Sequence, residues 1–203
     1  MKISFALARV FDVILPPRRT ERLARSLNIE HLEILARPDG ALPYHDELIR
    51  ALVWEIKYRK NAEALTLAGT FLAERALAIA EETLSKPVLV PVPMHRARRK
   101  ARGYNQTELL CAAIMNASPD SFLYAPHALV RARNTIPQQG LPKYRRVKNI
   151  LGAMEVADAS AVEGKVCIVI DDVSTTGATA AETKRALIEA GASHVHILAL
   201  AHS

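Results

Sequence analysis

The stretch VCIVIDDVSTTGAT, residues 166–179, decides the fold expected for this chain. Its first five residues, 166–170, are all apolar, which is typical of a central parallel strand covered on both faces. Two adjacent carboxylates, Asp171 and Asp172, follow the strand, and residues 174–179 are all small or hydroxylated. A helix is predicted next, so the stretch indicates one strand–loop–helix unit of an α/β protein.

The rest of the chain supports the same fold class. Apolar periodicity and β-branched runs predict helices over residues 46–58, 62–82, 105–117 and 178–190, and strands over residues 88–92, 128–131, 166–170 and 194–200. Strands that alternate with helices favour a parallel sheet flanked by helices. Residues 1–43 are predicted to form a small helical appendage, with helices over 1–15 and about 20–35, and residues 44–203 the main domain.

Composition limits the class of protein further. Half of the 203 residues are hydrophobic, which is enough for a sizeable core, and the net charge is +6. Residues 94–148 hold eleven Lys or Arg against two Asp or Glu, whereas the remainder is slightly acidic. This concentration points to an anionic partner, either phosphates or nucleic acid, and the alternative is a solvated basic face.

Cysteine usage and hydropathy favour a cytoplasmic protein. Cys111 and Cys167 stand far apart and outside any C-x-x-C pair, so we expect two buried thiols in a reducing compartment. No apolar run approaches the ~18 residues that a membrane span needs, and no membrane insertion is expected. The apolar N-terminus is interrupted by Arg9 and Asp12 and lacks a small-residue cleavage site, which favours an amphipathic helix over a signal peptide.

The loop after the strand 166–170 carries groups suited to a sugar phosphate. Two adjacent carboxylates at the end of a strand are costly unless a hydrogen-bond donor or a cation pairs with them. The two hydroxyls of a ribose or a hydrated Mg²⁺ would do so. The backbone N–H groups of residues 174–179, with the start of the following helix, can surround a phosphate. The alternative is a structural turn in which one aspartate caps the helix. The loop lacks the Gly-Lys-Ser/Thr of a Walker A motif.

This loop resembles the ribose-phosphate signature of type I phosphoribosyltransferases, and the chain as a whole is similar to the ComF family of competence-associated, phosphoribosyltransferase-like proteins. The similarity covers about four-fifths of the chain, residues 44–202. Further matching segments are Glu55-Ile56-Lys57-Tyr58, Val90-Pro91-Val92-Pro93, Arg102-Gly103-Tyr104-Asn105-Gln106, Gln138-Gln139-Gly140-Leu141, and Arg145 with Asn149.

The resemblance implies a type I phosphoribosyltransferase-like fold that binds phosphoribosyl pyrophosphate with Mg²⁺ carried by the ligand. Phosphoribosyl transfer to an unknown acceptor is the expected reaction, which makes the protein a transferase of the glycosyltransferase class. The residues implied as phosphoribosyl-binding are Asp171, Asp172, Ser174, Thr175, Thr176, Gly177, Ala178 and Thr179. Lys57 and Arg102 are implied as pyrophosphate-binding, and they join Asp171 and Asp172 as the catalytic set.

One further segment gains an expectation from the resemblance, and another from its length and lack of period. The basic run from His95 to Tyr104 would be a mobile loop over the pyrophosphate, with Gly103 as its joint. The aperiodic segment from Asn134 to Gly152, with Gln138-Gln139 and Arg145-Arg146, would be a lid. The alternatives are a solvated basic loop, a surface loop without a chemical role and, for Lys57, a cation that only stabilises the end of its helix.

The sequence departs from the ComF family at the N-terminus. ComF-like chains usually carry a cysteine zinc ribbon there, but Pro16-Pro17-Arg18 is followed by Arg19, and no cysteine precedes Cys111. No zinc is therefore expected. His194 and His196 share one face of a strand, yet they lack a third ligand at suitable spacing and are expected to be ordinary surface or core residues.

A second function remains open beside the transferase. The chain could be a non-catalytic sugar-phosphate sensor or a DNA-binding accessory in natural transformation. Its partners would then include single-stranded DNA or DNA-uptake proteins, and Tyr104 could stack on a base.

Overall fold

A computed structural model describes residues 17–133 and 150–203, and its centre is a parallel sheet. The sheet has five strands in the order β1-β7-β6-β2-β3, and every neighbouring pair is parallel. The strands are β1 (Leu42–Pro43), β2 (Val88–Pro91), β3 (Leu123–Tyr124), β6 (Val166–Ser174) and β7 (His194–His202). A separate antiparallel pair joins β4 (Leu129–Arg131) to β5 (Met154–Val156). The α/β sheet predicted from the sequence is confirmed.

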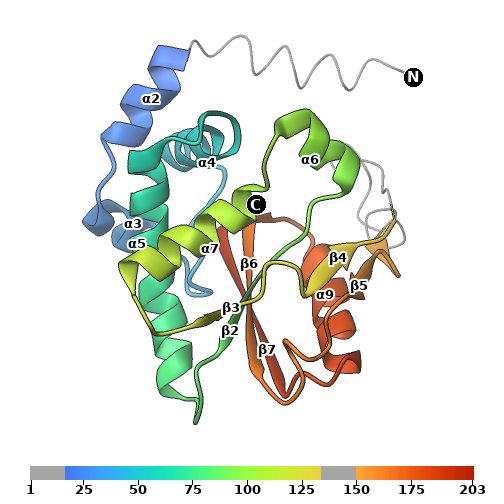
Figure 1. The fold of residues 1–203 in the computed structure, drawn as a ribbon. Helices are drawn as coiled ribbons and strands as arrows, with labels where there is room; N and C mark the ends of the chain where they lie inside the picture. The colour runs from blue at the N-terminus through green and yellow to red at the C-terminus, as the bar shows by residue number, and fades with distance from the viewer. Residues whose placement is uncertain (1–16, 134–149) are drawn as a thin grey trace.

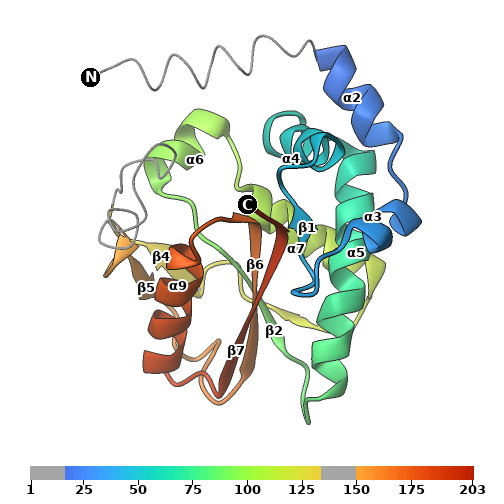
Figure 2. The same ribbon diagram turned by 180° about the vertical axis from the view of Figure 1, so that it is seen from behind.

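Helices cover both faces of this sheet (Figures 1 and 2). They are α2 (Pro17–Arg25), α3 (Ile29–Leu35), α4 (Glu47–Arg59), α5 (Ala62–Glu81), α6 (Arg96–Arg102), α7 (Gln106–Ala117) and α9 (Ala178–Glu189). One core lies between the sheet and α3, α4, α5 and α7, and a second lies between the sheet, α9 and the β4–β5 pair. None of these helices is long and apolar enough to cross a membrane.

The central strand β6 shows why residues 166–170 are continuously apolar. Ile168 and Ile170 belong to the first core, whereas Cys167 and Val169 face the second. All four side chains are fully buried, because each face of the strand is covered by helices. Both cysteines of the chain are free and buried, as expected.

The direction of the chain changes between β2 and β6. From β2 the chain proceeds to β3 on one side, and from β6 it proceeds to β7 on the other. Ligands of open α/β sheets bind beyond the carboxyl ends of the strands at such a switch point. Here α4 and α6 stand on either side above those strand ends (Figures 1 and 2).

Some predicted elements differ from the observed ones. The strand predicted at 166–170 continues to Ser174, so the two aspartates lie within β6. The basic run predicted to be a loop forms the helix α6, which ends at Gly103 in a left-handed conformation. The helix expected over residues 20–35 is divided into two, because Asn28 caps the start of α3. Strands β1, β3 and β5 were not predicted, since two or three residues are too few to show a period.

The described part of the N-terminal appendage packs on the main domain. In α2, the Thr20 hydroxyl donates to Oε1 of Glu55 at 2.7 Å, a carboxylate buried on α4. Leu32 of α3 and Leu42 of β1 contribute to the first core, and β1 pairs with β7. The boundary at residues 43 and 44 stays a prediction. The helix predicted over 1–15 lies outside the described residues.

Candidate functional site

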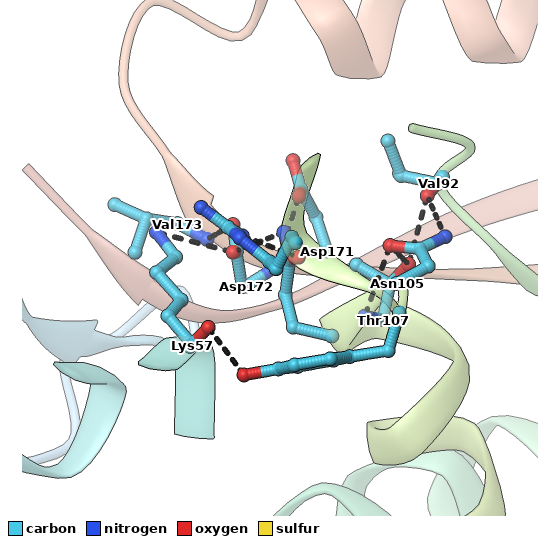
Figure 3. Close-up of polar contacts among 10 residues, drawn as sticks. Lys57, Val92, Asn105, Thr107, Asp171, Asp172 and Val173 are labelled. Atoms are coloured by element: carbon cyan, nitrogen blue, oxygen red, sulfur yellow. Dashed lines mark hydrogen bonds and ion pairs between the residues drawn. The ribbon is translucent and has the colours of Figure 1, made fainter. Parts of the chain in front are cut away.

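Asp171 and Asp172 lie near the carboxyl end of β6, beside the end of β2. Asp172 is buried, with an exposed fraction of 7%, and Asp171 is partly exposed. Oδ2 of Asp172 lies 3.1 Å from Nζ of Lys57 and accepts a hydrogen bond from Nε2 of Gln106 at 2.7 Å. The backbone N–H of Val173 donates to its other oxygen at 2.6 Å (Figure 3). Asp172 is thus fixed by both of its oxygens.

Asp171 has fewer partners than its neighbour. Its Oδ1 accepts the backbone N–H of Asp172 at 2.8 Å, and its carboxylate also contacts the side chain of Asp172. Burial, together with the adjacent carboxylate of Asp172, raises the pKa of Asp171 to about 7. The carboxylate of Asp171 therefore keeps acceptor capacity for an incoming hydrogen-bond donor or cation.

The Lys57–Asp172 pair determines the protonation of both groups. Burial disfavours the charge on Asp172, but the ammonium of Lys57 and the surrounding hydrogen bonds hold the pKa of Asp172 below its usual value. Burial likewise disfavours the charge on Lys57, yet the carboxylate of Asp172 raises the pKa of Lys57. The pair is therefore ionised at neutral pH.

The segment from Arg102 to Gln106 turns from α6 into α7. Gly103 ends α6 with φ +85°, a conformation that favours glycine. The Tyr104 hydroxyl donates to the Lys57 carbonyl at 2.6 Å, and Nδ2 of Asn105 donates to the Val92 carbonyl at 3.0 Å (Figure 3). The turn is thereby attached to α4 and to the end of β2. Gly103 is the C-terminal cap of α6, and its role as the joint of a mobile segment stays a prediction.

This turn brings Arg102 to the acidic pair through Gln106. Nη1 of Arg102 donates to Oε1 of Gln106 at 2.7 Å, and the other end of the same amide donates to Asp172. The guanidinium of Arg102 also lies 5.1 Å from the centre of the Tyr58 ring. Lys57, Arg102 and Asp172, which the sequence predicted as one site, therefore belong to one connected network.

Residues 174–178 form a turn that leads from β6 into α9. The helix starts without a side-chain cap at Gly177, whose φ is +71°. In the described part of the chain, the backbone N–H groups of residues 175–178 have no hydrogen-bond acceptor, and neither has the buried hydroxyl of Thr176. We call these donors the cradle. Unused donors at a helix N-terminus suit an anion.

Two basic residues that were not predicted as part of the site interact electrostatically with its members. Arg131 lies at the end of β4, where burial and the neighbouring Arg98 lower its pKa and Asp171 raises it. The pKa of Arg98, on α6, is lowered by burial and by Arg102. Arg98 stood in the sequence among four other cations, so nothing marked it. Arg131 comes near Asp171 only because β4 pairs with β5, which packs on α9.

Gln106 was not predicted as a site residue, although it ends the segment Arg102-Gly103-Tyr104-Asn105-Gln106 that resembles the ComF family. Thr179 of the predicted set lies in the first turn of α9. Five residues that were named from the sequence lie outside the described residues: Gln138, Gln139, Arg145, Arg146 and Asn149. His194 and His196 share one face of β7, with ring centres 6.0 Å apart, and His194 is exposed.

Comparison with known proteins identifies the family. The DNA utilization protein YhgH of Salmonella typhimurium is 32% identical over 154 residues, which cover 73% of this chain and 65% of that protein. Competence protein ComFC of Bacillus subtilis is 27% identical over 161 residues, covering 78% of this chain and 61% of that protein. The chain belongs to the ComF family. It thus spans slightly less than two thirds of the length of these ComF relatives. No family model matches it.

Solved structures similar to this ComF chain are phosphoribosyltransferases. A hypoxanthine phosphoribosyltransferase from Trypanosoma cruzi, in complex with its product IMP, is 11% identical with a TM-score of 0.43, over 68% of this chain and 63% of that one. A glutamine phosphoribosylpyrophosphate amidotransferase from B. subtilis is 18% identical with a TM-score of 0.44, over 73% and 30%. Similarity at this level is weak, and the strand order and the acidic loop carry the fold class. The ComF chain has a type I phosphoribosyltransferase-like α/β fold.

Proposed function

We propose that this protein binds phosphoribosyl pyrophosphate with Mg²⁺ and transfers its phosphoribosyl group to an acceptor. The observation that carries the proposal is the pairing, at one strand end, of a fixed acidic pair with an unused set of anion donors. The cradle would take the 5-phosphate, and the carboxylate of Asp171 would accept a hydrogen bond from a ribose hydroxyl. Relatives in the same family are named for competence and DNA utilization, which suggests that the protein acts in the handling of DNA taken up by the cell.

The pyrophosphate would lie on the cationic side of the site. Lys57 of α4 is paired with Asp172, and Arg102 of α6 is linked to Asp172 through Gln106. Arg98 lies near Arg102. Arg131 lies near Asp171. Guanidinium groups bind phosphate oxygens at two points, which suits them to a leaving pyrophosphate. Together these side chains would supply more positive charge than the two aspartates cancel.

In the proposed reaction, a lone pair of the acceptor forms a bond to carbon 1 of the ribose. The bond from carbon 1 to the pyrophosphate oxygen breaks, and its electron pair leaves with the pyrophosphate. Positive charge develops on the sugar ring, as in glycoside cleavage. The carboxylate of Asp171 would stabilise this charge, while Lys57 and Arg102 would stabilise the departing anion.

The acidic pair also fits the Mg²⁺ that such a ligand carries. No group of three or more His, Cys, Asp or Glu side chains gathers in the described ranges 17–133 and 150–203. A cation beside Asp171 would thus take most of its oxygen ligands from the pyrophosphate and from water, as Mg²⁺ commonly does. When bound, it would neutralise charge on the leaving group.

Calorimetry with phosphoribosyl pyrophosphate and Mg²⁺ tests the binding proposal. We expect micromolar affinity for the wild type and about a 30-fold loss for Asp171→Asn, since a hydrogen bond to a charged group is worth about 2 kcal/mol. The control is Asp158→Asn, an exposed acid whose carboxylate accepts from Ser160 and from the backbone N–H of Ala161 and from no residue of the site. Equal affinity in the wild type and Asp171→Asn would refute the assigned role. Pyrophosphate release over a panel of nucleobases then separates a transferase from a sensor.

A second candidate function, contact with single-stranded DNA, is favoured by one surface. Three aromatic rings and three cations meet beside Lys57, in and just after α4 and in the segment from the end of α6 toward α7; they are Trp54, Tyr58, Tyr104, Arg59, Lys60 and Arg102. Tyr58 is 47% exposed. Aromatic faces bordered by cations are typical of surfaces that bind single strands without sequence preference.

The DNA contact predicts a salt-dependent affinity for oligothymidine that Tyr58→Ala lowers several-fold. Tyr124→Ala is the matched control, because Tyr124 is 37% exposed on the edge strand β3 and makes none of these ring contacts. Equal loss in both variants would argue against a specific surface.

A further inference from the structure

The side chain of Gln106 connects the two sides of the proposed site. We propose that Gln106 is a positioning residue whose amide couples the pyrophosphate-binding Arg102 to the ribose-binding Asp172, so that filling one side of the site prepares the other. The inference rests on the proposed function for the identity of the ligands. It adds the route by which the ribose side and the pyrophosphate side act together.

Both ends of the Gln106 amide are used. Its oxygen accepts from Nη1 of Arg102 at 2.7 Å, and its nitrogen donates to Oδ2 of Asp172, also at 2.7 Å. The side chain is largely buried, with an exposed fraction of 9% for the residue, so water competes weakly for either bond. Arg102 ends α6, Gln106 begins α7, and Asp172 lies on β6, so one amide joins three elements.

An amide is the side chain that such a bridge requires. It presents an acceptor to the guanidinium and a donor to the carboxylate at once. A glutamate in its place would keep the bond to Arg102 but would repel Asp172. A methionine would fill the same space and make neither bond. Comparing glutamine, glutamate and methionine at position 106 therefore tests the contact with Arg102 and the contact with Asp172 separately, while the side-chain volume changes little.

Gln106 is not needed to start its helix. Asn105 is the N-cap of α7, and its amide donates to the Val92 carbonyl at 3.0 Å. The hydroxyl of Thr107 donates to the same carbonyl at 2.8 Å. These neighbours attach α7 to the end of β2, which leaves the Gln106 side chain free for the Arg102–Asp172 connection. Thr107→Val is thus a structural control at an adjacent buried position.

The coupling is measurable with the two halves of the ligand. Calorimetry would determine the affinity of the full chain for Mg²⁺-pyrophosphate, with and without saturating ribose 5-phosphate. In the wild type we expect ribose 5-phosphate to raise the pyrophosphate affinity at least fivefold. In Gln106→Met the increase should fall below twofold, and Thr107→Val should keep it. Gln106→Glu should retain pyrophosphate affinity while losing most of the affinity for ribose 5-phosphate.

Two results would overturn the proposal: an unchanged coupling in Gln106→Met, or its absence from the wild type although both ligands bind. A measurement without ligand distinguishes failure of the Gln106 proposal from failure of the proposed function. Because the hydrogen bond from Gln106 lowers the pKa of Asp172, a carboxyl ¹³C titration of Gln106→Met should show that pKa raised. If the pKa rises but no ligand binds, the positioning of Asp172 stands and the proposed ligand is wrong. An unchanged pKa would refute the positioning itself.

Discussion

The two sides of the site differ in how far the protein satisfies its own polar groups. On the acidic side, Asp172 is bound by Lys57, Gln106 and the backbone of Val173. In the cradle, the N–H groups of residues 175–178 and the hydroxyl of Thr176 have no acceptor in the described residues. One side is held together by internal bonds, and the other is open to an outside anion.

This difference suggests an order of events. A phosphate can enter the cradle without displacing a protein group, whereas a pyrophosphate that takes up Lys57 must compete with Asp172 for it. Ionised groups with strong internal partners exchange them only for equally strong ones, such as phosphate oxygens. Binding at the cradle would therefore come first, and rearrangement of the Lys57–Asp172 pair would follow.

The largest effect is expected where the acidic side is broken. Asp172→Asn removes the carboxylate that is paired directly with the ammonium of Lys57, leaving only the weaker charge interaction with Asp171, and should lower the free energy of unfolding by about 3 kcal/mol. Adding Lys57→Met to that variant should restore most of the loss. Urea unfolding of the wild type, both single variants and the double variant measures this. A double variant no more stable than Asp172→Asn would show that the pair is not what holds this side together.

A smaller, pH-dependent effect is expected at Asp171. The pKa of Asp171 in the folded protein, about 7, lies above its unfolded value, so the folded state binds the extra proton and loses stability as pH rises toward and through 7. Asp171→Asn removes this penalty. Its stability gain over the wild type should increase by about 1–2 kcal/mol between pH 5 and pH 8, a figure reduced for the partial exposure of the side chain. Urea unfolding at both pH values checks this. A gain independent of pH would contradict the raised pKa.

The smallest effect is expected in the cradle and has a matched control. Thr176 and Thr183 each hold a buried hydroxyl without a hydrogen-bond partner in the described residues. Replacing either with valine should stabilise the ligand-free protein by about 1 kcal/mol, because an unsatisfied polar atom is removed. Only Thr176→Val should weaken the affinity for ribose 5-phosphate, by about fivefold. Equal affinities in the two variants, measured by calorimetry, would exclude the Thr176 hydroxyl from the site.

The sequence predicted those features of the fold that depend on local patterns. The apolar run before Asp171 predicted a buried central strand, and the four long helices were placed within one or two residues of their observed ends. The short strands β1, β3 and β5 were missed, because their two or three residues pair only in the folded chain. The helix α6 was missed because its seven residues, Arg96–Arg102, include five cations and no apolar stripe.

The candidate site was predictable to a similar extent. Adjacent acids and small residues marked Asp171, Asp172 and the loop 174–179, and the family resemblance added Lys57 and Arg102. The link through Gln106 and the proximity of Arg98 and Arg131 depend on how α6 and the β4–β5 pair pack in the folded chain. No spacing along the chain records those contacts, so only the structure could supply them.

A crystal structure of the protein with phosphoribosyl pyrophosphate and Mg²⁺ tests the central claim most directly. The expected result is a 5-phosphate within hydrogen-bond distance of the N–H groups of residues 175–178 and the hydroxyl of Thr176, with a ribose hydroxyl on Asp171. A ligand bound elsewhere, or a cradle that stays without phosphate while the ligand is bound, would contradict it.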